Sequence, residues 1–178
     1  ALFAMANLQS GQTVLIHGGS GSVGAFAIQF AKQAGARVIT TASTARLDYV
    51  RSLGADVVIN YKTQRFEEVV SDVDVVLDSL GGVTRERSWN VLRRGGVLVT
   101  LVPPLPDPAQ AAARGVRATM NQNVVNAGEL LGRITTMLEM GQLRPAQVGL
   151  TLPLKEAQQA QVLLEQGTVQ GRVVLEVE

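Results

Sequence analysis

The sequence predicts an α/β fold, a doubly wound parallel sheet of six strands with helices on both faces. Short apolar, β-branched runs alternate with segments of helical periodicity through most of the chain, which is typical of right-handed βαβ crossovers. The runs are apolar throughout, as in strands that are buried on both faces. With 178 residues, 46% of them hydrophobic, the chain is long enough to form one well-buried core.

The expected elements follow one another in a regular order. Strands are expected at residues 13–17, 36–42, 56–60, 73–80, 97–102 and 116–120. Helices are expected between them, at residues 23–34, 44–53, 63–70, 84–92 and 107–114. The sixth strand should lie at an edge of the sheet, and it is followed by a helix at 126–140, an extended run at 148–154, a helix at 155–166 and a strand at 171–177. Residues 1–8 resemble the end of a helix that begins elsewhere.

A glycine-rich turn joins the first strand to the first helix. Gly19, Gly21 and Gly24 form the pattern G-x-G-x-x-G between a buried strand and a helical repeat. In the dinucleotide-binding fingerprint, the first glycine permits the tight turn, the second lets the backbone approach a pyrophosphate, and the third lets the helix pack close to the strand. The helix start, with Ser22 and Val23, offers free N–H groups and a positive dipole end to phosphates. We therefore expect a dinucleotide here, a glycine-rich turn without a ligand being the alternative.

The residues after the second strand indicate which dinucleotide binds. An NAD-binding domain usually has Asp or Glu there, about 20 residues past the glycines, to hold the 2′-hydroxyl of the ribose. Here small hydroxyl residues stand in that place and a cation follows, so Ser43 can donate to a 2′-phosphate and Arg46 can neutralise it. We therefore expect NADP(H) as the cofactor. An ordinary solvated cation is the alternative role of Arg46.

Composition and charge exclude several classes of function. The sequence has no cysteine and a single histidine, His17, so disulfides, thiolate metal sites and cysteine nucleophiles are excluded. The usual three-ligand zinc set would need clustered acids, which the sequence does not show, and we expect no metal and a buried His17. A net charge of +1 favours neither nucleic acid nor a membrane as a partner. Without a signal-peptide pattern or an apolar run of about 18 residues, we expect a soluble, cytoplasmic protein.

Several stretches together resemble one family. They are residues 11–18 with 21–24, 53–56 with 59–61, 74–82, 95–99 and 171–175. In their joint spacing the chain resembles the cofactor-binding half of a medium-chain dehydrogenase/reductase, of the zinc-independent quinone oxidoreductase (zeta-crystallin-like) branch. The resemblance covers essentially the whole chain and implies a Rossmann-type fold.

The resemblance implies roles for particular residues. In such reductases a basic residue after the second strand and a tyrosine after the third hold the 2′-phosphate, and Arg46 and Tyr61 stand in those places. Ser79, after the fourth strand, and Leu101 and Val102, after the fifth, would line the nicotinamide side. The alternatives are a half-buried loop tyrosine for Tyr61 and loop packing for Ser79 and Val102.

The resemblance also bears on domain organisation. Members of this branch have an amino-terminal GroES-like domain that supplies most of the substrate pocket, and this chain begins at the tail of the helix that should follow it. We expect residues 1–178 to be the dinucleotide-binding domain, and residues 148–178 to run back toward the missing domain. A fragment that is inactive by itself is expected; a natural protein that has lost half its active site is the alternative.

In the whole enzyme, the resemblance implies transfer of a hydride between NADPH and a small-molecule substrate, either a quinone or an activated alkene or carbonyl compound. No residue is an obvious proton donor, so no catalytic residue is assigned. The alternative is a sensor or scaffold domain that binds NADPH without turnover. A methyltransferase would need an acid at the end of the second strand, which is absent here. The edge strand suggests a homodimer formed edge to edge, whereas a helix-covered edge would predict a monomer.

Overall fold

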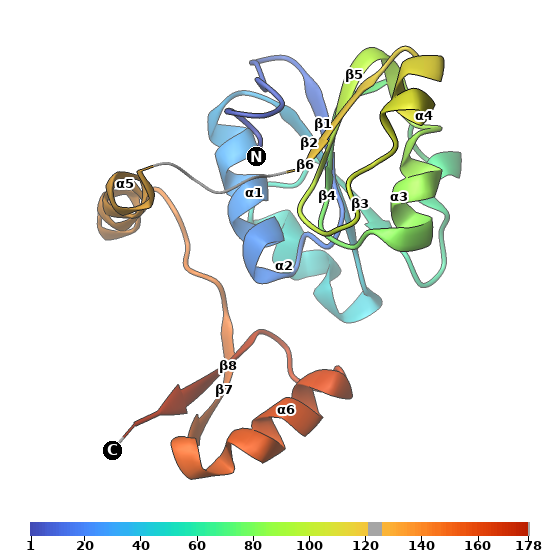
Figure 1. Cartoon of the computed structure of the whole chain (residues 1–178). Coiled ribbons are helices and arrows are strands. Elements are labelled where there is room, and N and C mark those ends of the chain that lie inside the picture. Colours follow the sequence, from blue (N-terminus) through green and yellow to red (C-terminus); the bar gives the residue numbers. More distant parts are fainter. Residues whose placement is uncertain (121–125, 178) are drawn as a thin grey trace.

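The computed structural model describes residues 1–120 and 126–177 of the chain. Its main feature is a six-stranded sheet with strand order β3-β2-β1-β4-β5-β6, in which all neighbouring strands are parallel. Helices cover both faces of this sheet, α1 and α2 on one side and α3 and α4 on the other (Figure 1). The predicted fold class is thereby confirmed, with β6 at one edge of the sheet.

The elements have the following bounds. The strands of the large sheet are β1 Thr13–Ile16, β2 Arg37–Ala42, β3 Val57–Asn60, β4 Val73–Asp78, β5 Leu92–Thr100 and β6 Arg117–Met120. The helices are α1 Ser22–Gln33, α2 Leu47–Ser52, α3 Gly82–Ser88, α4 Pro108–Ala113, α5 Ala127–Glu139 and α6 Ala157–Glu165. A separate two-stranded parallel sheet pairs β7 Val148–Pro153 with β8 Arg172–Glu176.

Alternating side chains of the central strands enter two hydrophobic clusters, one on each face of the sheet. Val14 and Ile16 of β1 belong to the cluster that includes Ile28 of α1. Leu15, which lies between them in sequence, belongs to the cluster that includes Trp89. Successive strand residues point to opposite faces, so an unbroken apolar run supplies both clusters at once. Full burial of each such side chain stabilises the fold by about 1.5–3 kcal/mol.

The glycine turn is compact because side chains are missing where the backbone segments meet. A Cβ atom on Gly24 would lie 2.3 Å from the carbonyl oxygen of Gly18 and 2.7 Å from the Cα of Gly19. A Cβ on Gly19 would lie 2.0 Å from Oγ1 of Thr40. Gly18, with φ +70°, takes the left-handed conformation, which favours glycine. The tight turn therefore depends on Gly18, and Gly19 is needed for space, which corrects the role that the pattern suggested for Gly19.

Helix α1 ends at a glycine, as the sequence predicts. Gly35 has φ +76°, and its N–H donates to the carbonyl of Lys32 at 2.9 Å. The N–H of Ala36 donates to the carbonyl of Ala31 at 3.0 Å. These two bonds form a Schellman motif, which satisfies carbonyls that the last helical turn leaves free. The chain then enters β2 directly.

Four expectations were wrong in detail. Residues 1–8 form turns in place of a helix. The helix expected from Thr63 is a single 3-10 turn, Phe66–Glu68. The buried Phe66 side chain holds this short connection against the hydrophobic cluster that includes Trp89. The helix expected to reach Leu92 ends at Ser88, since Leu92 already pairs with β4. The fifth strand, expected at residues 97–102, begins at Leu92 and ends at Thr100.

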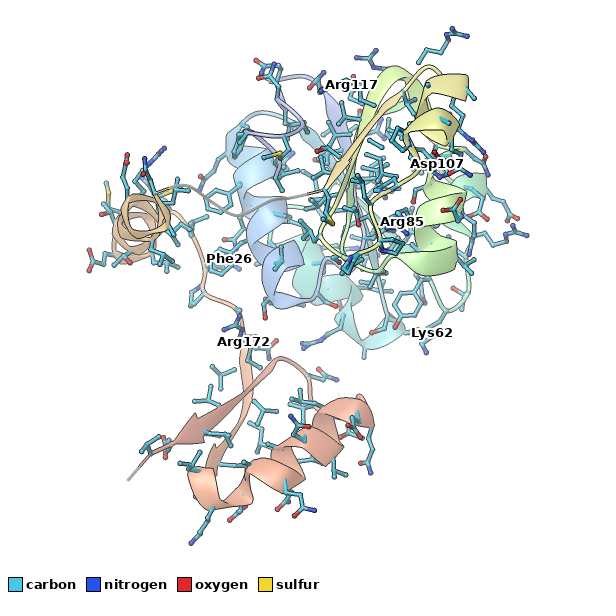
Figure 2. The ribbon with its side chains drawn as sticks, viewed as in Figure 1. Phe26, Lys62, Arg85, Asp107, Arg117 and Arg172 are labelled. Atoms are coloured by element: carbon cyan, nitrogen blue, oxygen red, sulfur yellow. The ribbon has the colours of Figure 1, made fainter. Side chains whose placement is uncertain are left out.

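Beyond α5, the chain first contacts α1 and then forms a unit of its own. The side-chain amide of Gln29 donates to the carbonyl of Arg144 at 3.1 Å and accepts from its N–H at 2.7 Å. β7, α6 and β8 follow, and neither strand pairs with the large sheet, so β7 with its Pro153 is confined to a small separate sheet. Figure 2 shows Arg172 where this unit, the C-terminal unit (residues 148–177), meets the rest of the chain.

The close approach at Gly24 can be tested by adding a single methyl group. Gly24→Ala should lower the free energy of unfolding by about 2–3 kcal/mol, because the new Cβ meets backbone atoms that cannot move aside cheaply. Gly132→Ala is the matched control: it lies within α5 with nothing within 4 Å of its Cβ position, and it should stabilise by about 0.5–1 kcal/mol. Urea unfolding followed by circular dichroism measures both. Equal stability of the Gly24→Ala variant and the unmodified chain would contradict the account.

Candidate functional site

The candidate site lies at the carboxyl ends of the parallel strands. β1 stands between β2 and β4, so the connections after β1 and β4 diverge to opposite faces at this point. Ligands of open α/β sheets bind in the crevice at such a switch point. A cavity of about 570 Å³ lies there. Its lining comes from the ends of β1 and β2, the loops after β3 and β4, and α3: His17, Gly18, Ser20, Gly21, Thr41, Ala42, Tyr61, Gln64, Phe66, Ser79, Leu80, Thr84 and Arg87. We call it the strand-end cavity.

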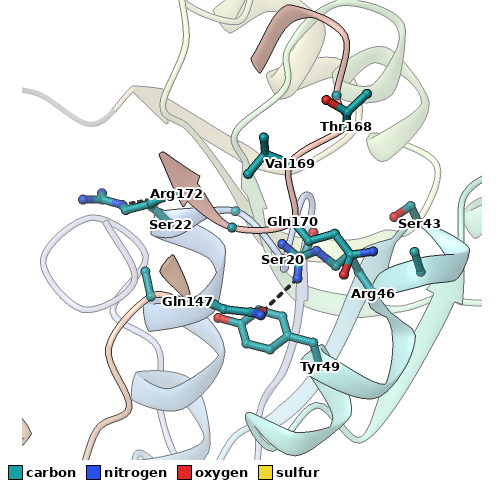
Figure 3. A pocket seen from close by; sticks show the side chains of 15 residues that line it. Ser20, Ser22, Ser43, Arg46, Tyr49, Gln147, Thr168, Val169, Gln170 and Arg172 are labelled. Atoms are coloured by element: carbon teal, nitrogen blue, oxygen red, sulfur yellow. Dashed lines mark hydrogen bonds between the residues drawn. The ribbon is translucent and has the colours of Figure 1, made fainter. Parts of the chain in front are cut away.

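A second cavity, of about 340 Å³, lies on the other side of the glycine turn. Figure 3 shows it between the start of α1, the loop after β2 and two segments that flank β7 and β8. Its lining includes Ser20, Gly21, Ser22, Ser43, Arg46, Tyr49, Gln147, Thr168, Gln170 and Arg172. We call it the arginine cavity, because two arginines and no acidic residue are among the described residues that line it.

Arg46 and Arg172 hold defined positions in the arginine cavity. The Nη1 atom of Arg46 donates to Oε1 of Gln147 at 2.9 Å, and its guanidinium lies 5.3 Å from the centre of the Tyr49 ring. The Nε atom of Arg172 donates to Oγ of Ser22 at 2.7 Å, at the start of α1. Figure 3 shows both bonds. The cavity thus has positive charge on two sides, beside the helix start whose dipole is also positive.

The structure brings some of the predicted residues together and separates others. Ser22, Ser43 and Arg46 line the arginine cavity, while Tyr61 and Ser79 line the strand-end cavity. The predicted glycine Gly21 lines both, so the two cavities meet at the glycine turn. Leu101 and Val102 line neither of them and follow the end of β5, where both are half-buried.

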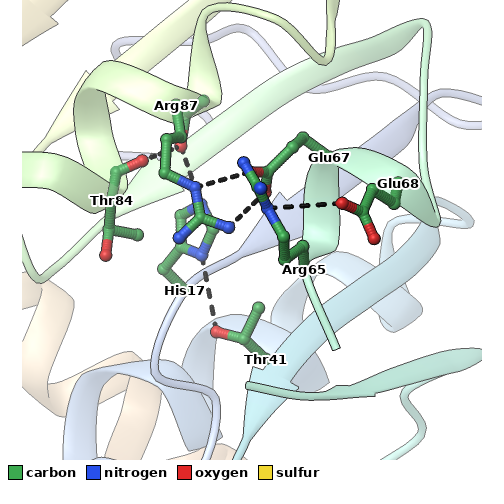
Figure 4. A network of polar contacts seen from close by, with 8 residues as sticks. His17, Thr41, Arg65, Glu67, Glu68, Thr84 and Arg87 are labelled. Carbon is green, nitrogen blue, oxygen red and sulfur yellow. Dashed lines mark hydrogen bonds and ion pairs between the residues drawn. The ribbon is translucent and has the colours of Figure 1, made fainter. Parts of the chain in front are cut away.

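His17 is buried at the base of the strand-end cavity, as expected for a lone histidine on an apolar strand. Its side chain is 1% exposed, with Nε2 at 2.8 Å from Oγ of Ser88 and Nδ1 at 3.4 Å from Oγ1 of Thr41 (Figure 4). The Ser88 hydroxyl donates its one proton to the carbonyl of Thr84 at 2.8 Å, so Nε2 of His17 carries the proton that Ser88 accepts. Burial lowers the pKa of His17 to about 4, and the ring is neutral at pH 7.

A second polar group ties α3 to the connection after β3. Nε of Arg87 donates to Oε1 of Glu67 at 2.6 Å, and Arg65 also donates to that oxygen (Figure 4). The hydrogen bond from Arg87 lowers the pKa of Glu67 to about 2, so its carboxylate stays ionised. The Arg87 guanidinium also lies 5.0 Å from the centre of the Phe66 ring. One wall of the strand-end cavity is therefore held by charged and aromatic contacts.

The sequence interpretation missed several lining residues. Gln64, Phe66, Thr84 and Arg87 in the strand-end cavity lie outside the glycine pattern, and no short motif marks them. In the arginine cavity it missed Tyr49, Gln147, Thr168, Gln170 and Arg172. Only Arg172 carried a signal, since it stands within one of the stretches that support the family resemblance.

Comparisons with known proteins agree with this fold. Residues 53–175 match the family described as zinc-binding dehydrogenase. The 2-methylene-furan-3-one reductase of Solanum lycopersicum is 35% identical over 142 residues, which are 79% of this chain and 34% of that protein. The quinone oxidoreductase structure from Coxiella burnetii has a TM-score of 0.86 at 34% identity, covering 97% of this chain and 55% of the other. A mycobacterial protein complexed with NADPH has a TM-score of 0.84 at 30% identity, covering 98% and 59%.

A doubly wound sheet with a glycine turn at its switch point defines the class of nucleotide-binding α/β domains. The chain belongs to the medium-chain dehydrogenase/reductase family, and its neighbours are of the quinone oxidoreductase type. It spans between about a third and three fifths of the length of the three relatives described above. No helix in the described part of the chain is long and apolar enough to cross a membrane.

The buried, neutral His17 predicts that acid weakens the fold. Its folded-state pKa of about 4 lies below the ordinary value of 6.5, so the unfolded chain takes up a proton first as the pH falls. Stability should therefore decline from about pH 6.5 and the loss should be complete below pH 4, on the order of 3 kcal/mol. Between pH 7 and 5, the urea midpoint of His17→Gln should change less than that of the unmodified chain. If the urea midpoints of the two proteins changed equally with pH, His17 would not be the cause of the loss of stability in acid.

Proposed function

We propose that this chain is the NADP(H)-binding domain of an oxidoreductase that transfers a hydride between NADPH and a quinone or an activated alkene or carbonyl substrate. The observation that carries the proposal is the arginine cavity beside the glycine turn. Ser22 and Ser43 offer hydroxyl donors there, and Arg46 and Arg172 offer positive charge. A phosphate needs this combination of donors and cations.

The glycine turn fits the pyrophosphate of a dinucleotide. Gly21 has no side chain, and a Cβ there would lie 3.3 Å from the Gly18 carbonyl oxygen, so the residue type leaves the turn's backbone uncovered for a phosphate. The first turn of α1 leaves its N–H groups without intrahelical partners, and the helix has no side-chain cap at Gly21. We therefore assign Gly19, Gly21, Ser22, Val23 and Gly24 to the pyrophosphate, either through backbone donors or through the space they leave.

The residues after β2 favour NADP(H) over NAD(H). A carboxylate in this place would repel a 2′-phosphate, and the described lining of the arginine cavity holds none. Arg46 is already drawn toward the cavity by Gln147, and we propose that it binds the 2′-phosphate together with Ser43. Tyr61, 55% exposed, is the second residue that the family resemblance assigns to the 2′-phosphate, although it lines the strand-end cavity and Arg46 lines the arginine cavity. The similar mycobacterial protein, whose structure holds NADPH, supports this choice.

The nicotinamide, when bound, supplies the hydride, and the protein positions it. We propose that Ser79, Leu101 and Val102, which follow β4 and β5, line the nicotinamide side. No catalytic residue is assigned. The described residues contain no group of three or more His, Cys, Asp or Glu side chains that could hold a metal ion.

The substrate class and the assembly are proposals about the whole protein. The relatives include a reductase of 2-methylene-furan-3-one and a quinone oxidoreductase, which supports an enone or quinone substrate. We propose that the C-terminal unit packs against a further domain of that protein, because Leu154, Val162 and Leu164 are each about half exposed here. The edge position of β6 supports a homodimer. The cytoplasm is the proposed location.

The cofactor assignment can be tested by calorimetric titration of the chain with NADPH and NADH at the same low salt. NADPH should bind at least tenfold tighter, about 1.4 kcal/mol, and Arg46→Glu should abolish this difference because it places a carboxylate beside the 2′-phosphate. Arg51→Glu is the matched control: among the described residues this exposed arginine on α2 pairs only with Asp48, and its reversal should keep the preference. Equal binding of both nucleotides by the unmodified chain would refute the NADP(H) assignment.

A further inference from the structure

Arg85 is a buried cation without a partner carboxylate. Its side chain, on α3, is 5% exposed, and within residues 1–120 and 126–177 it forms no ion pair. Its Nε atom is buried and has no hydrogen-bond partner in the described part of the chain. Buried charges are normally paired, and an unpaired one is costly. A buried, unpaired guanidinium of this kind calls for a functional or structural explanation.

The Arg85 guanidinium binds the loop that follows β5. Its Nη1 atom donates to the carbonyl of Pro104 at 2.6 Å and lies 3.3 Å from the carbonyl oxygen of Val102. Figure 2 labels Arg85 on α3, beside this loop. Pro103 and Pro104 have no N–H group, so they cannot donate the backbone bonds that would hold the loop in place. Arg85 supplies a donor from outside the loop.

The same loop is tied to the turn after β4. Oδ1 of the fully buried Asp78 accepts the N–H groups of Leu80 at 3.0 Å and Gly81 at 2.8 Å. The Thr100 hydroxyl lies 2.9 Å from Oδ2 of Asp78 and 3.0 Å from the carbonyl oxygen of Val102. One polar network therefore runs from the turn after β4 to the loop after β5, and Arg85 completes it on the side of α3.

We propose that Arg85 is a positioning residue that holds the loop at residues 101–104 in the place where the nicotinamide half of the cofactor binds. The inference rests on the proposed function, which assigns Leu101 and Val102 to the nicotinamide side. Arg85 lines neither cavity and acts only through the loop. Removing the Arg85 side chain should lower the affinity for the nicotinamide half of the cofactor. The affinity for the half that carries the adenosine and the 2′-phosphate should stay unchanged.

Two ligands separate the halves of the site: NADPH, and adenosine 2′,5′-bisphosphate, which lacks the nicotinamide. Calorimetry with the unmodified chain should show tighter binding of NADPH than of the bisphosphate. Arg85→Leu should lower the affinity for NADPH about tenfold and leave the affinity for the bisphosphate unchanged. Arg85→Lys, which keeps one donor, should recover part of the loss. Arg114→Leu is the matched control, because this exposed arginine lies between α4 and the amino end of β6, away from the loop at residues 101–104, and should change neither affinity.

Each result decides the proposal. If Arg85→Leu weakens both ligands equally, or neither, Arg85 does not position the nicotinamide end. If the unmodified chain binds both ligands equally well, the loop contributes nothing and the proposal fails while the proposed function stands. If it binds neither ligand, both fail. Should Arg85→Leu not fold, Thr100→Val loosens the same loop by removing the hydroxyl between Asp78 and Val102, and its two affinities are interpreted in the same way.

Discussion

The close contact between α1 and the glycine turn is the constraint on which the rest of the site depends. Gly24 lies so close to the backbone of Gly18 and Gly19 that no Cβ could stand between them. This contact brings the first turn of α1 to the switch point of the sheet, with its free N–H groups facing the end of β1. The two cavities meet at Gly21 because the turn is this narrow. A larger residue at position 24 would separate helix and strand and move both cavities apart.

Around this turn, charge is distributed unevenly. The strand-end cavity has a neutral imidazole at its base, and its one described cation, Arg87, is bound to Glu67. In the arginine cavity, Arg46 and Arg172 form no ion pair with a described residue, and their side-chain hydrogen bonds go to the uncharged oxygens of Gln147 and Ser22. The positive potential is therefore greatest beside the start of α1, which suits an anionic group at one end of a dinucleotide and a less charged group at the other.

Much of the fold could be predicted from the sequence, because it depends on local patterns. The apolar runs indicated all six strands of the large sheet, and Gly35 marked the end of α1. The connection around Phe66 could not be predicted, since its shape depends on burial against distant strands. The same holds for the site. The glycine turn could be predicted from its sequence pattern. The contact between Gln147 and Arg46 could not, because 101 positions of sequence separate the two residues and no local pattern indicates it.

The most direct test of the central claim is where NADPH binds on this chain. An NMR titration of the ¹⁵N-labelled chain with NADPH measures this residue by residue through the amide signals. The account predicts the largest shifts at Gly21, Ser22 and Val23, at the start of α1, and unchanged signals for Gly11 and Gly115, which precede β1 and β6 at the amino ends of the strands. Shifts that are largest at those amino ends, or no shifts at all, would contradict it.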